Sequence, residues 1–166
     1  AIGKDLNNLS MFKDMGITYI TLCHNGSNDI CDSAKGEPEH DGLSPFGREV
    51  VKEMNRLGII IDISHTSAKT VQDVLELSTA PIIASHSSAR ALCDHPRNLT
   101  DDQIRAIAAK GGVVQVCLYN WFLSKQPNPT ILDAVAHINH IVRLVGIDHV
   151  GIGTDFDGDD TEKLTG

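Results

Sequence analysis

The sequence contains no apolar run of the roughly 18 residues that a membrane-spanning helix needs. It also has no basic cluster, and 14 Lys and Arg residues against 22 Asp and Glu residues give a net charge of −8. Nucleic acid, as a polyanion, would meet net electrostatic repulsion from such a chain. These absences argue against a membrane-spanning helix and against nucleic acid as a partner.

Paired cysteine motifs and phosphate-binding loops are absent too. The cysteines, Cys23, Cys31, Cys93 and Cys117, form no CxxC pair, which argues against a zinc ribbon or a thioredoxin-type site. Cys23 and Cys117 lie in apolar runs, where a free thiol usually packs as a small hydrophobic group. No GxGxxG or GxxxxGK motif follows a strand-like run, which argues against a nucleotide-binding open sheet. The disulfide state and the cellular compartment stay open.

The chain has 166 residues, of which 41% are apolar and 22% charged, as in a globular domain with its own core. Strand-like apolar runs cover residues 17–23, 58–64, 81–85, 112–119 and 149–154. Helical patterns cover residues 4–15, 45–57, 67–77 and 130–144, and a further helix begins after Thr100. Segment 24–42 is polar, rich in glycine and long for a connection, so it is a candidate functional loop.

The alternation of strands and helices predicts an α/β fold with parallel strands and right-handed crossovers. Two arrangements compete: an open doubly wound sheet, or part of an eight-stranded (β/α) barrel. A complete barrel typically needs about 250 residues and at the least about 200. Five strands in 166 residues fall short of that, so length alone favours the open sheet.

Polar side chains follow each predicted strand at the point where it ends. They are His24, His65, His86, the pair Tyr119 and Asn120, and Asp155. Because the carboxyl ends of parallel strands share one face, we expect these side chains to converge there. One such histidine alone would usually be a structural group, but five equivalent positions indicate a functional site.

The residue types at these positions suit metal-assisted hydrolysis. Two neutral imidazoles and a carboxylate from successive strands form a plausible Zn²⁺ site, where the ion lowers the pKa of a water and polarises a carbonyl. Asp155 is positioned to take the proton of that water and pass it to a leaving amine. Residues 155–160 have two competing interpretations, an acidic turn or a Ca²⁺-binding loop. The Ca²⁺ loop is disfavoured, because the helix and the terminal Glu of an EF-hand are missing here.

The remaining charged candidates are less specific. Arg97, between a strand end and a helix cap, is either a surface ion pair or a clamp for a substrate carboxylate. His95 lies equally near but is not taken as a candidate. Four further histidines in loop or helix contexts are interpreted as solvent-exposed or packing residues: His40, His137, His140 and His149.

Five segments carry a family resemblance. They are, in order, YITLCHN, GLSPFGREVVKEMNRLGIIIDISH, PIIASHSSARALC, RNLTDDQI and VGIGTDFDG. They resemble the membrane (renal-type) dipeptidase family of zinc metallopeptidases, and the match extends over nearly the whole chain to about Gly158. The resemblance implies an eight-stranded barrel of the amidohydrolase type with two zinc ions, in which a metal-bridged hydroxide attacks the peptide carbonyl of a dipeptide.

The resemblance also implies roles for individual residues. His65 and His86 would ligate the second zinc, and Asp155 would be the acid/base beside the bridging water. His24 would contact the substrate or its tetrahedral intermediate, and Arg97 would hold the substrate carboxylate. Tyr119, at the end of the predicted strand 112–119, is a further candidate substrate-binding residue.

The chain departs from the family pattern at both ends. The His-x-Asp pair of the first zinc and the Glu that bridges the metals are not found here, and the last part of the barrel is missing after Gly166. The chain also begins at Ala1 without Met or a leader. We therefore expect residues 1–166 to be the central part of one (β/α)8 domain, an incomplete barrel of about five βα units, and to be inactive alone.

Other readings stay open at this point. The same metal chemistry serves lactam or lactone opening, and a degenerate homologue without catalysis would also carry these motifs. The missing part of the enzyme as a second chain and a homo-oligomer are both compatible with the sequence.

Overall fold

The computed structural model of the chain describes residues 2–156. Backbone contacts divide it into two compact units, Ala1–Ile83 (unit 1) and Ala84–Gly166 (unit 2), which are considered separately. In each unit the paired strands run parallel and alternate with helices in the chain. The predicted α/β class is confirmed.

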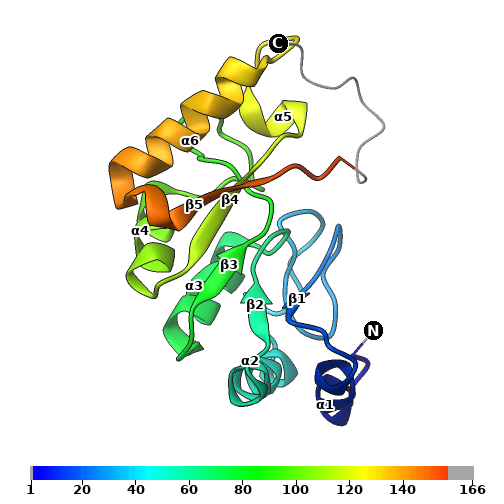
Figure 1. The fold of residues 1–166 in the computed structure, drawn as a ribbon. Coiled ribbons are helices and arrows are strands. Elements are labelled where there is room, and N and C mark those ends of the chain that lie inside the picture. Colours follow the sequence, from blue (N-terminus) through cyan, green and yellow to red (C-terminus); the bar gives the residue numbers. More distant parts are fainter. Residues whose placement is uncertain (1, 157–166) are drawn as a thin grey trace. The chain divides into compact units, whose positions relative to one another are not determined.

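Unit 1 contains three parallel strands in chain order (Figure 1). Tyr19 of β1 pairs with Ile60 of β2, and Ile61 of β2 pairs with Ile82 of β3. The element bounds are α1 Asn7–Asp14, β1 Tyr19–Thr21, α2 Pro45–Leu57, β2 Ile60–Asp62, α3 Ala68–Leu77 and β3 Ile82–Ala84, the last crossing into unit 2. All five predicted helices and strands that lie wholly in this unit are present; α2 has the predicted bounds, and the other four are shorter than predicted.

The start and end of helix α2 are determined by its local sequence. The Ser44 hydroxyl accepts a hydrogen bond from the backbone N–H of Gly47 at 2.9 Å, and Pro45 occupies the first turn, where no N–H is needed. The helix ends at Gly58, whose φ of 66° lies in the left-handed region that glycine adopts without strain. Its buried face packs on β2 and α3.

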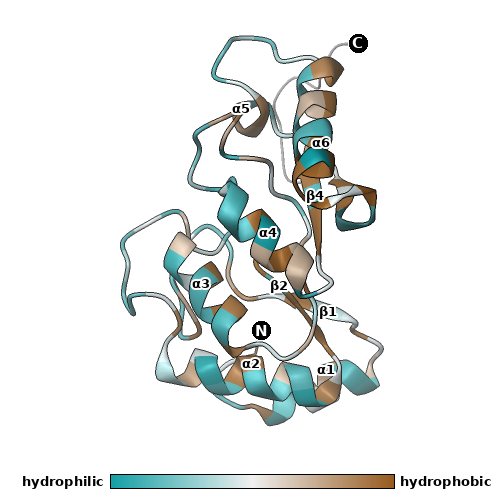
Figure 2. Ribbon diagram, turned by 90° about the vertical axis from the view of Figure 1, so that its left-hand side faces the viewer, coloured by the Kyte–Doolittle hydropathy of each residue, from teal (hydrophilic) through white to brown (hydrophobic). Residues whose placement is uncertain are grey.

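Unit 2 contains two parallel strands covered by helices. Val114 of β4 pairs with Val150 of β5, and helix α6 packs against both strands and against α4 (Figure 1). Strand β4 is drawn mostly in the hydrophobic colour in Figure 2, since four of its five residues, all but Gln115, are apolar. The bounds are α4 Asp101–Ala109, β4 Val113–Cys117, α5 Asn120–Leu123, α6 Ile131–Val145, the 3₁₀ turn η1 Ile147–His149 and β5 Val150–Gly153.

Capping boxes start the two long helices of unit 2. The side chain of Thr100 accepts from the backbone of Gln103 at α4, and Thr130 pairs in the same way with Asp133 at α6. The predicted starts of both helices are therefore confirmed. The short elements α5 and η1 carry no periodic pattern and were not predicted.

The cysteines and His137 are packing residues, whereas His40, His140 and His149 are half-buried and each has a ring nitrogen close to an oxygen of another segment. All four cysteines lie among residues 2–156, where they are buried and form no disulfide. His137 is 1% exposed; its Nδ1 accepts from the N–H of Ala89 at 3.0 Å, and its Nε2 lies 3.0 Å from the carbonyl oxygen of Leu123. Burial lowers the pKa of His137, so the ring stays neutral. Within residues 2–156 no helix combines the length and the apolar character needed to cross a membrane.

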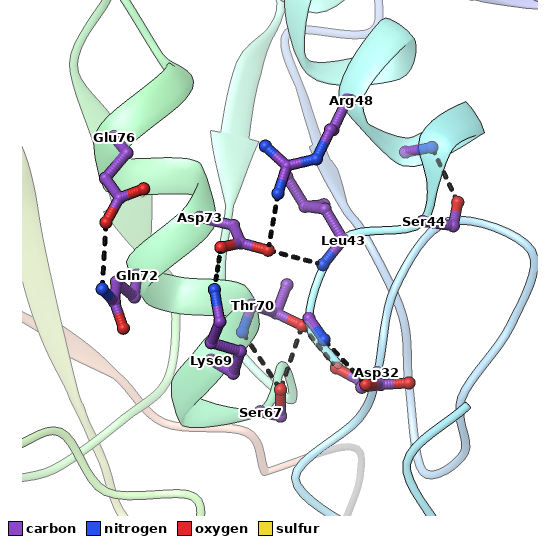
Figure 3. A network of polar contacts seen from close by, with 12 residues as sticks. Asp32, Leu43, Ser44, Arg48, Ser67, Lys69, Thr70, Gln72, Asp73 and Glu76 are labelled. Atoms are coloured by element: carbon purple, nitrogen blue, oxygen red, sulfur yellow. Dashed lines mark hydrogen bonds and ion pairs between the residues drawn. The ribbon is translucent and has the colours of Figure 1, made fainter. Parts of the chain in front are cut away.

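The long loop of unit 1 is held by two buried carboxylates (Figure 3). Oδ1 of Asp32 accepts from the backbone N–H groups of Glu39 at 2.7 Å and His40 at 3.0 Å, and Oδ2 accepts from Gly42 at 2.8 Å. Burial alone would raise the pKa of the Asp32 carboxyl, but these backbone donors bring it below its ordinary value. The loop is thereby folded back on itself rather than left open.

Asp73 on α3 ties the end of this loop to the helices. Its Oδ2 accepts from the N–H of Leu43 at 2.9 Å and from Arg48 at 3.2 Å, while Lys69 contacts Oδ1 (Figure 3). Burial opposes ionisation of Asp73, yet Lys69 and the Leu43 N–H bring its pKa below the ordinary value. Gly42 must be glycine, since its φ is 111° and a Cβ would lie 2.4 Å from Oδ2 of Asp73.

Candidate active site

In unit 1 the structure brings together two of the side chains predicted to meet at strand ends. His24 follows β1 and His65 follows β2, and their ring centroids lie 4.3 Å apart with a tilt of 34°. His24 is exposed, whereas His65 is only 7% exposed. An open imidazole thus lies over a buried one at the carboxyl end of the parallel strands.

His65 is held in an uncommon backbone conformation. Its φ is 69°, a left-handed value that costs a non-glycine residue energy and often occurs at functional sites. Its carbonyl oxygen accepts from the N–H of Ala34 at 2.7 Å and from the hydroxyl of Ser33 at 3.1 Å, both in the long loop. The loop that Asp32 and Asp73 anchor is therefore what holds His65 in place.

Asn25 selects one tautomer of His65. The Nδ1 atom of His65 lies 3.3 Å from Oδ1 of Asn25. Because an amide oxygen only accepts, Nδ1 carries the proton, and Nε2 keeps the lone pair that a metal ligand needs. The sequence analysis did not single out Asn25, although it directly follows His24.

Asp62 is a second residue that the sequence analysis missed. It is fully buried at the end of β2, where Oδ2 accepts from the Thr21 hydroxyl at 2.7 Å and Oδ1 accepts from the N–H of Ser64 at 3.0 Å. These bonds join the ends of β1 and β2 and shape the turn that leads to His65. Its place inside an apolar run, IIIDIS, was the available signal.

In unit 2, His86 follows β3 beside the end of β5. Its Nδ1 lies 2.7 Å from the hydroxyl of Ser85, which can accept from Nδ1–H and leave Nε2 as the ligating atom. A Cβ at Gly153 would lie 1.8 Å from the carbonyl oxygen of Ser85, so only glycine permits this approach of the two strand ends. Asp155, two residues after Gly153, is half-buried with a φ of 57°. Residues 157–160 of the acidic segment lie outside the described residues.

Arg97 is buried, so the interpretation as a surface ion pair is wrong. It is 9% exposed, its Nη2 donates to the carbonyl oxygen of His86 at 3.2 Å, and its Cζ lies 5.0 Å from the ring centroid of Phe122. Tyr119 meets the same Phe122 ring edge-on at 4.8 Å. The structure thus brings Arg97 and Tyr119 into one cluster through Phe122, a residue that no sequence motif indicated.

Both candidate imidazoles fit zinc in donor type. Each has its Nδ1 next to a side-chain oxygen, which is the usual arrangement around a histidine that binds a metal through Nε2. A catalytic zinc uses three protein ligands, and residues 2–156 contain no group of three or more His, Cys, Asp or Glu residues placed to hold an ion. The described part of the chain therefore offers ligands to a metal but no complete site.

Comparison with known proteins gives a match to one family. The family model described as "Membrane dipeptidase (Peptidase family M19)" matches residues 1–164. Dipeptidase tcpJ of Claviceps purpurea is 42% identical over 159 residues, which are 95% of this chain and 37% of that protein. The chain thus spans little more than a third of the length of this curated relative.

Solved structures agree with this match. The probable dipeptidase PvdM of Pseudomonas aeruginosa superposes with a TM-score of 0.89 at 30% identity, over 94% of this chain and 55% of that one. A metallopeptidase of Rhodobacter sphaeroides, liganded with a phosphinate mimic of the dipeptide L-Ala-D-Ala, has a TM-score of 0.87 at 34% identity, over 95% and 48%. The fold is accordingly of the parallel (β/α)-barrel type of these enzymes, not the open sheet that length alone favoured.

Proposed function

Because the chain belongs to the membrane dipeptidase family, peptidase family M19, we propose that it is part of a zinc-dependent enzyme that hydrolyses dipeptides. The observation that carries the proposal is the family match over residues 1–164. It is supported by the strand-end histidines, since Nδ1 of His65 lies next to the side-chain oxygen of Asn25, as is usual for a histidine that binds a metal through Nε2. We further propose that residues 1–166 form the central part of a single (β/α)8 domain and that the isolated chain is inactive.

His65 and His86 are the proposed zinc ligands of this chain. Zinc, when bound, lowers the pKa of a water toward about 7 and polarises the substrate carbonyl. Asn25 holds the His65 ring in the tautomer that ligation requires, and Ser85 contacts His86 at the equivalent atom. The remaining ligands lie outside this chain in the proposal.

Asp155 and His24 are the proposed catalytic groups. Asp155 accepts the proton of the attacking water and delivers it to the amine of the departing amino acid. His24, exposed above His65, donates a hydrogen bond to the oxyanion that forms at the peptide carbonyl. Asp155 follows β5 with a φ of 57°, and His24 follows β1, so both side chains come from the carboxyl ends of strands.

Arg97 and Tyr119 are the proposed substrate-binding groups. The planar guanidinium of Arg97 suits the carboxylate at the free C-terminus of a dipeptide, which it binds through paired N–H groups. Tyr119 lies at the N-terminus of α5 and contacts the Phe122 ring beside Arg97. In a dipeptide, the C-terminal carboxylate that this cluster would bind belongs to the residue that directly follows the peptide bond to be cleaved.

The test uses the complete parent enzyme, reconstituted with zinc, and a free dipeptide. We expect hydrolysis that a chelator abolishes and added zinc restores, about two zinc ions per chain, and loss of both activity and zinc in His86→Ala. The matched control is His140→Ala, because His140 lies on α6 and contacts Asp101 on α4 instead. A zinc-loaded parent that opens lactams but leaves dipeptides intact, or that binds no zinc, would contradict the proposal.

A further inference from the structure

The buried guanidinium of Arg97 is oriented by an aromatic ring. Its Cζ lies 5.0 Å from the centroid of the Phe122 ring, which is within the range of a cation–π contact. The Phe122 side chain carries no nitrogen or oxygen, so this contact supplies no conventional hydrogen-bond acceptor to the five N–H donors of the guanidinium. Phe122 can therefore hold the group in position without occupying any N–H that a carboxylate would need.

The Phe122 ring is itself fixed on several sides. The backbone carbonyl oxygen of Phe122 accepts a hydrogen bond from Nδ2 of Asn98 at 2.8 Å. The ring centroid of Tyr119 lies 4.8 Å from that of Phe122 in an edge-on arrangement, and the ring centroid of His95 lies 4.5 Å from it. Phe122 is 5% exposed. Since Asn98 directly follows Arg97, the same bond ties helix α5 to the segment that carries the arginine.

The backbone of Arg97 is held by the same cluster. Its N–H donates to Nδ1 of His95 at 3.1 Å, and its Nη2 donates to the carbonyl oxygen of His86 at 3.2 Å. Burial lowers the pKa of His95, with the nearby Arg97 and Arg90 adding to the effect, so the ring stays neutral and accepts this bond. Both ends of the arginine are thus constrained, and Phe122 supplies the surface against which the charged end rests.

We propose that Phe122 is a positioning residue that holds the Arg97 guanidinium ready for the carboxylate of the substrate and so contributes to selection of free C-termini. The inference rests on the proposed function, because it assigns a role within the same substrate site. Phe122 touches neither substrate nor metal in this proposal and acts only through Arg97.

The test compares a dipeptide with its C-terminal amide in the zinc-loaded parent enzyme. In Phe122→Leu, which removes the ring face, we expect KM for the free dipeptide to rise about 3- to 10-fold with kcat changed less than about 2-fold. The preference for the free dipeptide over the amide should fall by the same factor. Phe122→Tyr keeps the ring face and should restore most of the preference.

A double-mutant cycle separates positioning from a purely structural role. In an Arg97→Met background, Phe122→Leu should change the preference no further, because there is no guanidinium left to position. If Phe122→Leu does not fold, Phe122→Met replaces it, since methionine keeps the apolar volume without the ring. An unchanged preference in the folded single variant, or an equal fall in the Arg97→Met background, would overturn the inference while leaving the dipeptidase proposal intact. A wild-type parent without dipeptidase activity would overturn the proposed function itself.

Discussion

At the scale of single residues, two buried carboxylates carry much of the order in unit 1. Asp32 accepts three backbone N–H groups of the long loop, and Asp73 joins that loop to α3 through Leu43. Neither side chain contacts His65 in these bonds, yet the loop they hold supplies Ser33 and Ala34 to the His65 carbonyl. Residues remote from the proposed chemistry therefore determine where its histidine lies.

Asp32→Asn should lower the free energy of unfolding of the complete protein by about 1–3 kcal/mol. The amide nitrogen of asparagine cannot accept, so at least one of the three N–H groups loses its partner. Urea unfolding followed by circular dichroism measures the change. The matched control is Asp14→Asn at an exposed position, where a change within about 0.5 kcal/mol is expected, and equal effects of the two substitutions would contradict this account.

The lowered pKa of Asp32 also predicts how its contribution to folding stability changes with pH. The pKa of Asp32 lies below its ordinary value of about 4 in the folded protein, so its contribution to stability is present above that pH. It should be lost as the pH falls below about 4, through the lowered folded-state pKa. In Asp32→Asn this part of the acid destabilisation should be missing from unfolding curves recorded between about pH 6 and 2.

At the scale of elements, the first turn of helix α2 is in direct contact with the long loop. Gly47 lies inside this helix, and a Cβ there would come within 2.0 Å of the carbonyl oxygen of Ile30. That carbonyl already accepts from the N–H of Ser44, the residue that caps the helix. The start of α2 and the loop therefore require each other, which fixes the direction in which the helix leaves the strand-end region.

Gly47→Ala should destabilise the complete protein by about 1–3 kcal/mol, because helix and loop must separate to admit the methyl group. Helix propensity alone predicts the opposite sign, since alanine is favoured over glycine by about 1 kcal/mol in a helix interior. Thermal unfolding decides between the two. Gly26→Ala is the control, because nothing lies within 4 Å of a Cβ at Gly26; a stabilised Gly47→Ala would contradict the close approach.

At the scale of the whole molecule, residues 2–156 expose several large apolar side chains. Leu132 is 73% exposed and Val135 41% on one face of α6, and Ile152 of β5 is 63% exposed. In the proposed (β/α)8 domain, the parts absent from this chain would cover such positions.

Residues 1–166 expressed alone should therefore aggregate and bind a hydrophobic dye, whereas the complete parent should neither aggregate nor bind the dye. Light scattering and dye fluorescence measure the two properties. Leu132→Glu should reduce association of the isolated chain, because it places a charge on the exposed face of α6. Asp148→Lys, at an exposed position of η1, serves as the control. An isolated chain that is monomeric and does not bind the dye would contradict the proposed central fragment.

The sequence by itself determined the local structure and the family. Caps such as Ser44, Gly58 and Thr100 act within one turn of chain, and β-branched runs favour strands wherever they are buried, so these elements follow from short segments. The polar residues at strand ends could likewise be named, since parallel pairing sends all carboxyl ends to one face. The short helix α5 escaped prediction because four residues show no period.

Only the tertiary structure decided which side chains share a contact and which are buried. Arg97 lies 25 residues before Phe122 in the chain, and Asn25 lies 40 residues before His65, so no local pattern could pair them. The burial of Arg97, which separates a surface ion pair from an oriented guanidinium, depends on how α5 folds back over the segment before α4. Contacts of this kind arise when distant segments pack, because the free energy of a side chain depends on its neighbours in space as well as in sequence.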